Sequence, residues 1–341
     1  MRGDVKTLVA ELLSRFFWVT ALVMMALGLW LPGDFDFLRP FIPLFLGGIL
    51  FFTALKVPLG QIVEHLHVRR LPALAVLTVL KLVVLGAVGW GIAQVIAPQW
   101  ALGVALVMAM PAGLSASAMT DLYRGQVGFA LVFTLVTSVL APLSIPALLL
   151  ILDPDTSIAL GVLGERALYI TLLLGTPLTL AQIVRRLAPA LVRRHHHRWS
   201  YGAVCSSCLL IFVSISSNRL AWQDLPLTAL LTPLLVCTAA LSVALATAIA
   251  LARYWRGPEG VAFGFCCLWM NNGLAVAFAD RFYHGNAGVI LPAVLMQLPI
   301  IASVAVLGAW WTAQAARVRV ATESGSHAGS GSPEVRKSGS P

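Results

Sequence analysis

The chain has 341 residues, of which 59% are hydrophobic and 11% are charged, and its formal net charge is +9. Soluble globular proteins carry about 25% charged residues, so this composition excludes a soluble domain and indicates an all-α polytopic membrane protein. The positive charge is accounted for by Lys and Arg in loops on one side of the membrane, so we expect no nucleic-acid partner.

Ten long apolar runs follow one another along the chain. A bilayer core of roughly 30 Å requires about 20 apolar residues per helix, so each run predicts one transmembrane helix in a lipid bilayer. The expected spans are residues 14–31, 40–56, 72–97, 100–123, 127–151, 160–184, 200–218, 226–251, 258–282 and 287–314.

The distribution of Lys and Arg predicts the orientation of the chain, because loops that carry them stay in the cytoplasm. With a cytoplasmic N-terminus, most of the 23 Lys and Arg residues fall on cytoplasmic segments. The exceptions are Arg39, Arg166, Arg219 and Arg281 in outer loops, and Lys81 inside the third span. We therefore expect a bacterial inner membrane protein with both termini, 1–13 and 315–341, in the cytoplasm. The C-terminal tail, rich in Gly and Ser from Thr322 onward, is expected to be disordered.

Lys81 is the one charge expected deep in the membrane. An ionisable side chain at that depth costs a few kcal/mol and usually faces a cavity or the interior of the helix bundle. The acidic residues all fall in loops, tails or span ends, so no carboxylate is expected beside it. The alternative is a snorkelling lysine, although Lys81 lies deeper than its stem can reach.

Two segments of the chain share a plan. GVALVMAMPAGLSASAMTDLYRGQVG (103–128) and GVAFGFCCLWMNNGLAVAFADRFYHGNAG (260–288) each begin with GVA and contain a small or polar interruption. Because each half of the chain, 14–151 and 160–314, holds five spans, the two repeats must be inverted with respect to the membrane. Inverted repeats with one interrupted helix each are typical of secondary transporters, whose binding site lies at the bilayer midplane.

The two interruptions are the candidate binding site. Pro111 removes a helix hydrogen-bond donor and Gly113 loosens the backbone, and Ser115 follows them. In the ninth span, Asn271 and Asn272 need hydrogen-bond partners in apolar surroundings. Irregular backbone at this depth is tolerated only inside protein or beside a polar cavity. A proline kink with serines bonded to the preceding turn is the alternative.

These motifs resemble one family of transporters. MPAGLSASAMTDLYRGQVGFALVFTLVTSVLAPLSIP (110–146) is similar to the fourth and fifth helices of the bile acid:sodium symporter family, whose pattern is P-G-G-x-x-S-N, then R-G-D and a helix bearing Ser and Thr. NNGLAVAFA (271–279) resembles the Q-N-S-G-L-A segment of its ninth helix. The chain looks like a divergent, bacterial-type member.

The resemblance implies a fold of two domains in which interrupted helices 4 and 9 cross. A core domain would consist of helices 3–5 and 8–10 (72–151 and 226–314). A panel domain would consist of helices 1, 2, 6 and 7 (14–56 and 160–218). The resemblance further implies alternating access, in which one domain moves against the other.

The chain departs from the family where the resemblance assigns sodium ligands. Several family oxygen ligands (Ser, Asn, Glu and Gln) fall on methyl, thiol, thioether or ammonium groups here. The positions are Lys81, Ala116, Ser117, Ala130, Thr134, Cys266 and Met270, of which Ser117 and Thr134 keep a hydroxyl and also belong to the expected substrate region. Sodium requires hard oxygen ligands. Both sodium sites are therefore expected to be degraded, which puts sodium coupling in doubt.

Lys81 suggests a substitute for a bound ion. Its ammonium falls at the position of a Gln in the second sodium site and is a candidate built-in cation. Together with two half-helix N-termini, near Ser115 and Asn272, a fixed positive charge favours an anion. We expect a small or amphipathic organic anion as substrate and no cofactor. A proton that binds and leaves Lys81 remains an alternative coupling ion.

Other functions are less compatible with the sequence. GLSAS resembles a serine nucleophile turn, but all seven His residues lie in loops or the tail, so no base is available and no enzyme is expected. His195–His197 form a metal-binding alternative, but the flanking Arg residues favour a solvated loop and no metal. The sequence is also compatible with a non-transporting membrane receptor or scaffold on the same fold, and with an arsenite-type exporter that would use Cys266 and Cys267.

Overall fold

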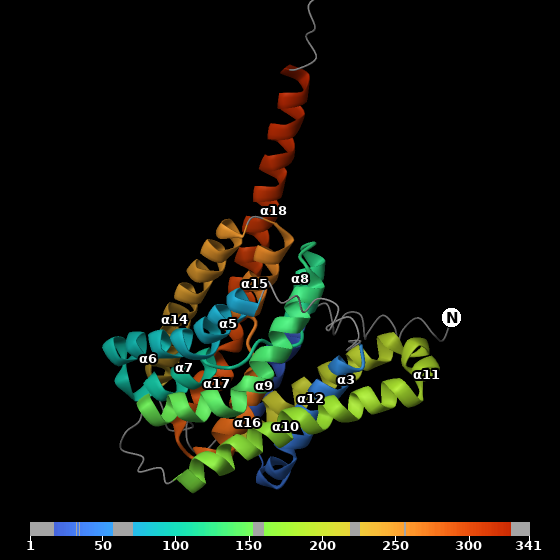
Figure 1. The fold of residues 1–341 in the computed structure, drawn as a ribbon. Coiled ribbons are helices and arrows are strands. Elements are labelled where there is room, and N and C mark those ends of the chain that lie inside the picture. The colour runs from blue at the N-terminus through green and yellow to red at the C-terminus, as the bar shows by residue number, and fades with distance from the viewer. Residues whose placement is uncertain are drawn as a thin grey trace, which may run out of the picture.

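The computed structural model in Figure 1 is helical throughout. It describes residues 17–31, 33, 35–56, 71–152, 160–218, 226–255 and 257–328. No β-strand occurs in these ranges, where an isolated antiparallel bridge joins Ala112 to Met270. The all-α class expected from the sequence is confirmed. The N-terminal segment 1–13 lies outside the described residues.

The elements follow one another in two series. The first half of the chain contains α2 (Phe17–Trp30), the 3-10 helix η1 (Asp36–Phe41), α3 (Ile42–Ala54), α5 (Leu71–Val79), the π-helix η3 (Leu80–Val84), α6 (Leu85–Ile96), η4 (Pro98–Trp100), α7 (Ala101–Met108), α8 (Ala116–Leu122) and α9 (Val127–Leu152). The second half contains α10 (Leu160–Leu187), α11 (Pro189–Arg194), α12 (His196–Ser216), α14 (Leu227–Tyr254), α15 (Pro258–Leu268), α16 (Asn272–Phe282), α17 (Ala287–Leu295) and α18 (Gln297–Ala328).

Within the described ranges, seven stretches are long and apolar enough to cross a membrane. They are Asp36–Ala54, Leu71–Ile96, Val127–Leu152, Val162–Leu187, Arg198–Ser216, Leu231–Tyr254 and Ala287–Gln314. In the other three expected spans, no single described helix is long enough to cross a membrane. The first is described only as the 14 residues of α2. The other two, at 100–123 and 258–282, are each divided into two short helices, which is the interruption that the sequence predicted.

The outer surface of these helices is apolar. Large hydrophobic side chains such as Val76, Val139, Leu143 and Leu235 are more than half exposed. Contiguous exposed apolar surface is unfavourable in water but matches hydrocarbon chains, and within helices the backbone polar groups are bonded internally. The surface therefore fits an integral membrane protein.

The helix contacts fall into two groups. In the first group α3 packs against α10 and α12, and α12 packs against α2. In the second group α14 contacts α6, α15, α17 and α18, and α7 contacts α6 and α17. Figure 1 shows α3, α10, α11 and α12 to one side of the molecule and α6, α7, α14 and α17 to the other. The two groups are joined by α9, which packs against α10, and by α16, which contacts α3 and α12.

The last helix is longer than the tenth expected span. It continues to Ala328, beyond residue 314, so part of the segment expected to be disordered is helical. Residues 315–324 contain neither Pro nor Gly, so nothing in this part of the chain ends the helix. The remainder of the tail, 329–341, lies outside the described residues.

Candidate functional site

The two interrupted helices meet at their breaks. Helix α7 ends at Met108 and α8 begins at Ala116, whereas α15 ends at Leu268 and α16 begins at Asn272. The segments between them run antiparallel. The Gly113 amide donates a hydrogen bond to the Trp269 carbonyl at 2.8 Å, and the Asn271 amide donates to the Pro111 carbonyl at 2.9 Å. Each break thus supplies hydrogen-bond partners for the other, which allows irregular backbone at membrane depth.

Gly113 is required by the closeness of this approach. A β-carbon at this position would lie 2.9 Å from Cδ1 of Trp269 and 3.2 Å from the Met270 carbonyl oxygen. Contacts this short require the Trp269 ring or the facing backbone to shift, so glycine suits the close approach. The glycine that the sequence marked as a helix breaker therefore also lets the two backbones pair.

The second break ends in a capped helix. Asn271 precedes α16, and its Oδ1 accepts a hydrogen bond from the Leu274 amide at 3.2 Å. The Asn272 side chain donates through Nδ2 to Oε1 of Gln297 at 3.1 Å. The adjacent asparagines thus have different roles: Asn271 caps the helix, whereas Asn272 links the break to the start of α18. The N-terminus of α16, with its partial positive charge, lies at the break.

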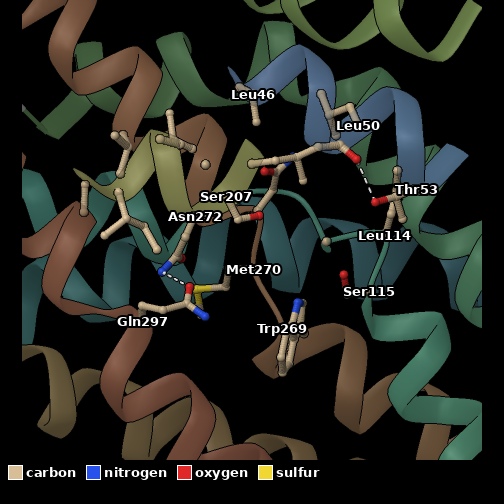
Figure 2. Close-up of a pocket in the computed structure, with 18 of the residues that line it drawn as sticks. Leu46, Leu50, Thr53, Leu114, Ser115, Ser207, Trp269, Met270, Asn272 and Gln297 are labelled. Atoms are coloured by element: carbon tan, nitrogen blue, oxygen red, sulfur yellow. Dashed lines mark hydrogen bonds between the residues drawn. The ribbon is translucent and has the colours of Figure 1, made fainter. Parts of the chain in front are cut away.

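A cavity of about 130 Å³ lies at the breaks. Figure 2 shows Ser115, Trp269, Met270 and Asn272 around it, with residues of α3 and α12 opposite. It is lined by Leu46, Ile49, Leu50, Thr53, Gly113, Leu114, Ser115, Ser207, Leu210, Ile211, Trp269, Met270, Asn271, Asn272, Gly273, Val276, Ala293, Val294 and Gln297. Of the predicted site residues, this cavity brings together Gly113, Ser115, Asn271 and Asn272, with Met270 from the sodium-site positions.

A second, larger cavity of about 400 Å³ adjoins the same breaks. It shares Asn271 with the first cavity and extends between α9 and α10. Thr134 contributes from α9, and Gln182 and Arg186 contribute from the last turns of α10. Among the residues that the structure describes, no Asp or Glu lines either cavity. The two cavities therefore offer apolar walls, amide and hydroxyl groups and one cation.

Lys81 lies at the end of α7, next to the first break. It is fully buried, in the π-helical turn η3, and its Nζ donates a hydrogen bond to the Met108 carbonyl at 3.1 Å. Met108 is the last residue of α7, so the ammonium lies at the negative end of that helix rather than at the N-termini near Ser115 and Asn272. Lys81 lines neither cavity.

The helix dipoles explain this placement. The carbonyls at the end of α7 lack partners within the helix, and an ammonium satisfies one of them with a charge of the favourable sign. Cys266 and Cys267, in the last turns of α15, lie within electrostatic range of the same ammonium. Lys81 therefore sits where the C-terminal ends of the two half-helices converge.

The positions that the resemblance assigned to sodium are buried but poor in oxygen. Ala116, Ala130 and Cys266 are fully buried, and the Cys266 thiol lies 3.8 Å from the Ala130 carbonyl. Ser117 donates to the Leu114 carbonyl at 2.7 Å, a bond within its own turn. Thr134 is buried beside the second cavity.

The metal-binding alternative at His195–His197 falls partly outside the described side chains. No group of three or more His, Cys, Asp or Glu that could hold a metal ion is found in the described part of the chain. The His195 Nδ1 atom lies 3.2 Å from the Leu191 carbonyl. The side chains of His196 and His197 lie outside the described residues.

Sequence reasoning missed three residues of the site. Arg186 was counted only as an orientation signal, although it reaches the second cavity. Gln297 is a polar residue inside the apolar tenth span, which is itself a signal of function in a membrane helix. Trp269 gave no signal, because an aromatic residue in an apolar run is ordinary.

Comparisons with known proteins identify the family of the chain. Residues 43–224 match the Sodium Bile acid symporter family. An uncharacterized protein of Pseudomonas aeruginosa, PA2026, is 30% identical over 168 residues, which cover 48% of this chain and 49% of that protein. An uncharacterized sodium-dependent transporter of Bacillus subtilis, YocS, is 22% identical over 218 residues, which cover 63% of this chain and 67% of that protein. The chain thus spans about half the length of the first relative and two thirds of the second. It belongs to the Sodium Bile acid symporter family, a family of membrane transporters.

Proposed function

We propose that the protein is a secondary transporter that carries a small or amphipathic organic anion across the membrane by alternating access, without sodium coupling. The observation that carries the proposal is the pairing of the two breaks. It leaves the capped N-terminus of α16 beside two cavities whose described lining holds no carboxylate. Helix N-termini and a nearby arginine favour negative charge.

The character of the two cavities supports an anion as substrate. Arg186 supplies a full charge at the second cavity, and Asn271 and Ser115 supply polar groups at the breaks. The remaining lining is mostly Leu, Ile, Ala and Gly, which suits an apolar body. A substrate with one anionic group and an apolar portion uses both features.

Alternating access is supported by where the cavities lie. Each is bounded by the first group of helices, through α3 with α10 or α12, and by the breaks on the other side. We propose that the first group is the panel domain (14–56 and 160–218) and the second the core domain (72–151 and 226–314). The two interrupted helices favour an inverted repeat of 14–151 and 160–314, with both termini on the cytoplasmic side.

We assign to Lys81 the role of a built-in cation. In broken-helix transporters the C-terminal ends of half-helices coordinate the coupling cation. The Lys81 ammonium donates to the last carbonyl of α7 and lies near the end of α15, so it supplies a positive charge at such an end. Because the Lys81 ammonium neutralises the negative ends of these helices, the positive N-termini at the breaks dominate the local field and favour an anion. A proton on Lys81 is the alternative coupling ion.

The donor groups present do not suit sodium. Side chains at Ala116, Ala130, Cys266 and Met270 offer no oxygen, and Lys81 repels a cation. The Ser117 hydroxyl donates to a neighbouring carbonyl. We therefore propose transport that is independent of sodium, although the B. subtilis relative is described as sodium-dependent.

Transport is tested in two steps. A screen of organic anions against the purified protein identifies ligands that raise its unfolding temperature. Proteoliposomes then measure uptake of the best ligand with a proton gradient, a sodium gradient or counter-substrate. We expect flux that is independent of sodium. Binding without flux in all three conditions would contradict transport and favour a receptor.

A further inference from the structure

We propose that a basic cavity at the end of α3, separate from the transport cavities, binds the phosphate group of an anionic phospholipid. The cavity has a volume of about 200 Å³. It is lined by Leu55, Lys56, Arg185, Pro189, Val192 and Arg193. Three of these six side chains are cations, and none of them lines the cavities at the breaks.

Two of the cations are held in place by neighbouring elements. The Arg185 guanidinium donates through Nη1 to the Leu55 carbonyl at 2.8 Å, just beyond the end of α3. The Lys56 ammonium donates to the Ser200 hydroxyl at 3.1 Å, on α12. Burial lowers the pKa of Lys56 from its ordinary value. Lys56 is thus partly removed from water and would gain from an anion beside it.

The described protein supplies no such anion. No acidic side chain lines the cavity in the part of the chain that the structure covers. The ion pairs found there join Arg39 or His284 to Asp280 and Arg281 to Glu165, which involve none of the three cations. Three like charges around a small cavity repel one another, so a phosphate from outside would remove an unfavourable interaction.

The position of the cavity identifies the source of the phosphate. Three stretches that can cross the membrane end here, because Asp36–Ala54 stops directly before Leu55, Val162–Leu187 contains Arg185 near its end, and Arg198–Ser216 begins five residues after Arg193. The cavity therefore lies at the level of lipid headgroups. Basic pockets between transmembrane helices at this level bind anionic lipid headgroups.

An apolar groove on the same helices suits the acyl chains. A cavity of about 770 Å³ between α3 and α10 is lined by Gly48, Phe52 and Leu180, among others. Gly48 and Phe52 are four residues apart and share one face of α3, and Lys56 continues this spacing two residues beyond the end of the helix. A lipid with its phosphate at Lys56 can therefore lay a chain along Phe52. A free phosphate would make no use of this groove, which favours a lipid.

The test uses the full-length protein in a neutral detergent and three probes. We measure the shift in unfolding temperature with phosphatidylglycerol, with zwitterionic phosphatidylcholine and with inorganic phosphate. Arg193→Gln removes a cation that lines the cavity, and Arg194→Gln removes the adjacent exposed arginine of α11, which does not line it. We expect phosphatidylglycerol to stabilise the parent most, and Arg193→Gln to weaken its binding by roughly fivefold. Arg194→Gln should leave that binding unchanged.

Any other outcome would contradict part of the proposal. Equal weakening by Arg193→Gln and Arg194→Gln would indicate diffuse attraction between a basic surface and the lipid. Equal stabilisation by inorganic phosphate would indicate a small-anion site, and equal stabilisation by phosphatidylcholine would exclude a role for net charge. If Arg193→Gln does not fold, Lys56→Gln, whose amide can still bond Ser200, takes its place against the same control.

Discussion

Arg39 and Asp280 form an ion pair that joins the two groups of helices. Arg39 Nε lies 3.2 Å from each carboxylate oxygen of Asp280, and Nη2 donates to the Asp280 carbonyl at 3.2 Å. Arg39 lies in η1, before α3, whereas Asp280 lies near the end of α16. The Asn218 amide also donates to this carboxylate, at 3.5 Å. The pair lies at the opposite end of α3 from Arg185, so the transport cavities lie between the two.

Removing one partner of this pair should destabilise the protein. The Asp280 side chain is only 9% exposed, so Arg39→Gln leaves a largely buried carboxylate with fewer partners. We expect a loss of about 1.5–3 kcal/mol in the free energy of unfolding. The double variant Arg39→Gln with Asp280→Asn should lose less than the sum of the single variants, because no charge remains unpaired. Thermal unfolding in detergent measures this, and strictly additive losses would show that the pair has no coupling energy.

Gly113→Ala tests the pairing of the breaks. A β-carbon there meets the Trp269 side chain at 2.9 Å and the Met270 carbonyl oxygen at 3.2 Å, so the ring or the facing backbone must shift, at a cost of about 1–3 kcal/mol. Gly164→Ala in α10 is the matched control, since nothing lies within 4 Å of its β-carbon. It should be neutral or stabilising, as expected for Gly to Ala in a helix. Thermal unfolding of both variants decides, and equal stability would mean that the breaks are not held this closely.

Substitutions at Asn271 distinguish an effect on folding from an effect on anion binding. Asn271→Asp keeps a capping oxygen for the Leu274 amide but adds a negative charge to both cavities. We expect near-normal stability and loss of anion binding. Asn271→Ser is the neutral control, which also caps the helix and should retain most of the affinity. Titration calorimetry measures the affinity of each variant for the identified anion. Equal affinity of the two variants would show that the anion does not bind beside Asn271.

Sodium should have no specific effect. Methyl, thiol and thioether groups at Ala116, Ala130, Cys266 and Met270 replace the oxygens expected of a sodium site. Replacing sodium with potassium at constant ionic strength should therefore leave anion affinity and uptake unchanged. A saturable increase of either with sodium concentration would contradict this prediction.

The sequence predicted the breaks but not all of their surroundings. Pro111, Gly113 and the Asn pair stand out because polar and helix-breaking residues are rare in apolar spans, and the structure divides the helices at these positions. Arg186 was missed because charge at a span end is also the ordinary orientation signal. Only the three-dimensional packing of α10 against α3 brings that arginine to a cavity.

Lys81 shows a second limit of sequence reasoning. Its depth could be predicted from its place in the third span, but the helix end that it contacts could not. The sequence placed a positive charge beside the N-termini near Ser115 and Asn272, whereas the ammonium bonds the C-terminal carbonyl of Met108. The end of α7 and the start of α8 flank the same break, so the position of Lys81 within its span does not distinguish them.

We propose that the Lys81 ammonium substitutes for a bound cation at the breaks. Lys81→Arg should retain part of the anion affinity, since the charge survives although the shape changes. The smallest change expected to introduce sodium dependence is the double substitution Lys81→Gln with Cys266→Glu. It restores an oxygen-bearing side chain at two positions where the family has Gln and Glu.

The most direct measurement is the affinity of the purified Lys81→Met variant for the anion found in the thermal screen. Met is similar in length and uncharged, so it fills the buried space without the charge. We expect at least a tenfold loss of affinity, about 1.4 kcal/mol, in a variant that still unfolds cooperatively. If Lys81→Met binds and transports the anion as well as the parent protein, the built-in cation is excluded and Lys81 has a structural role alone.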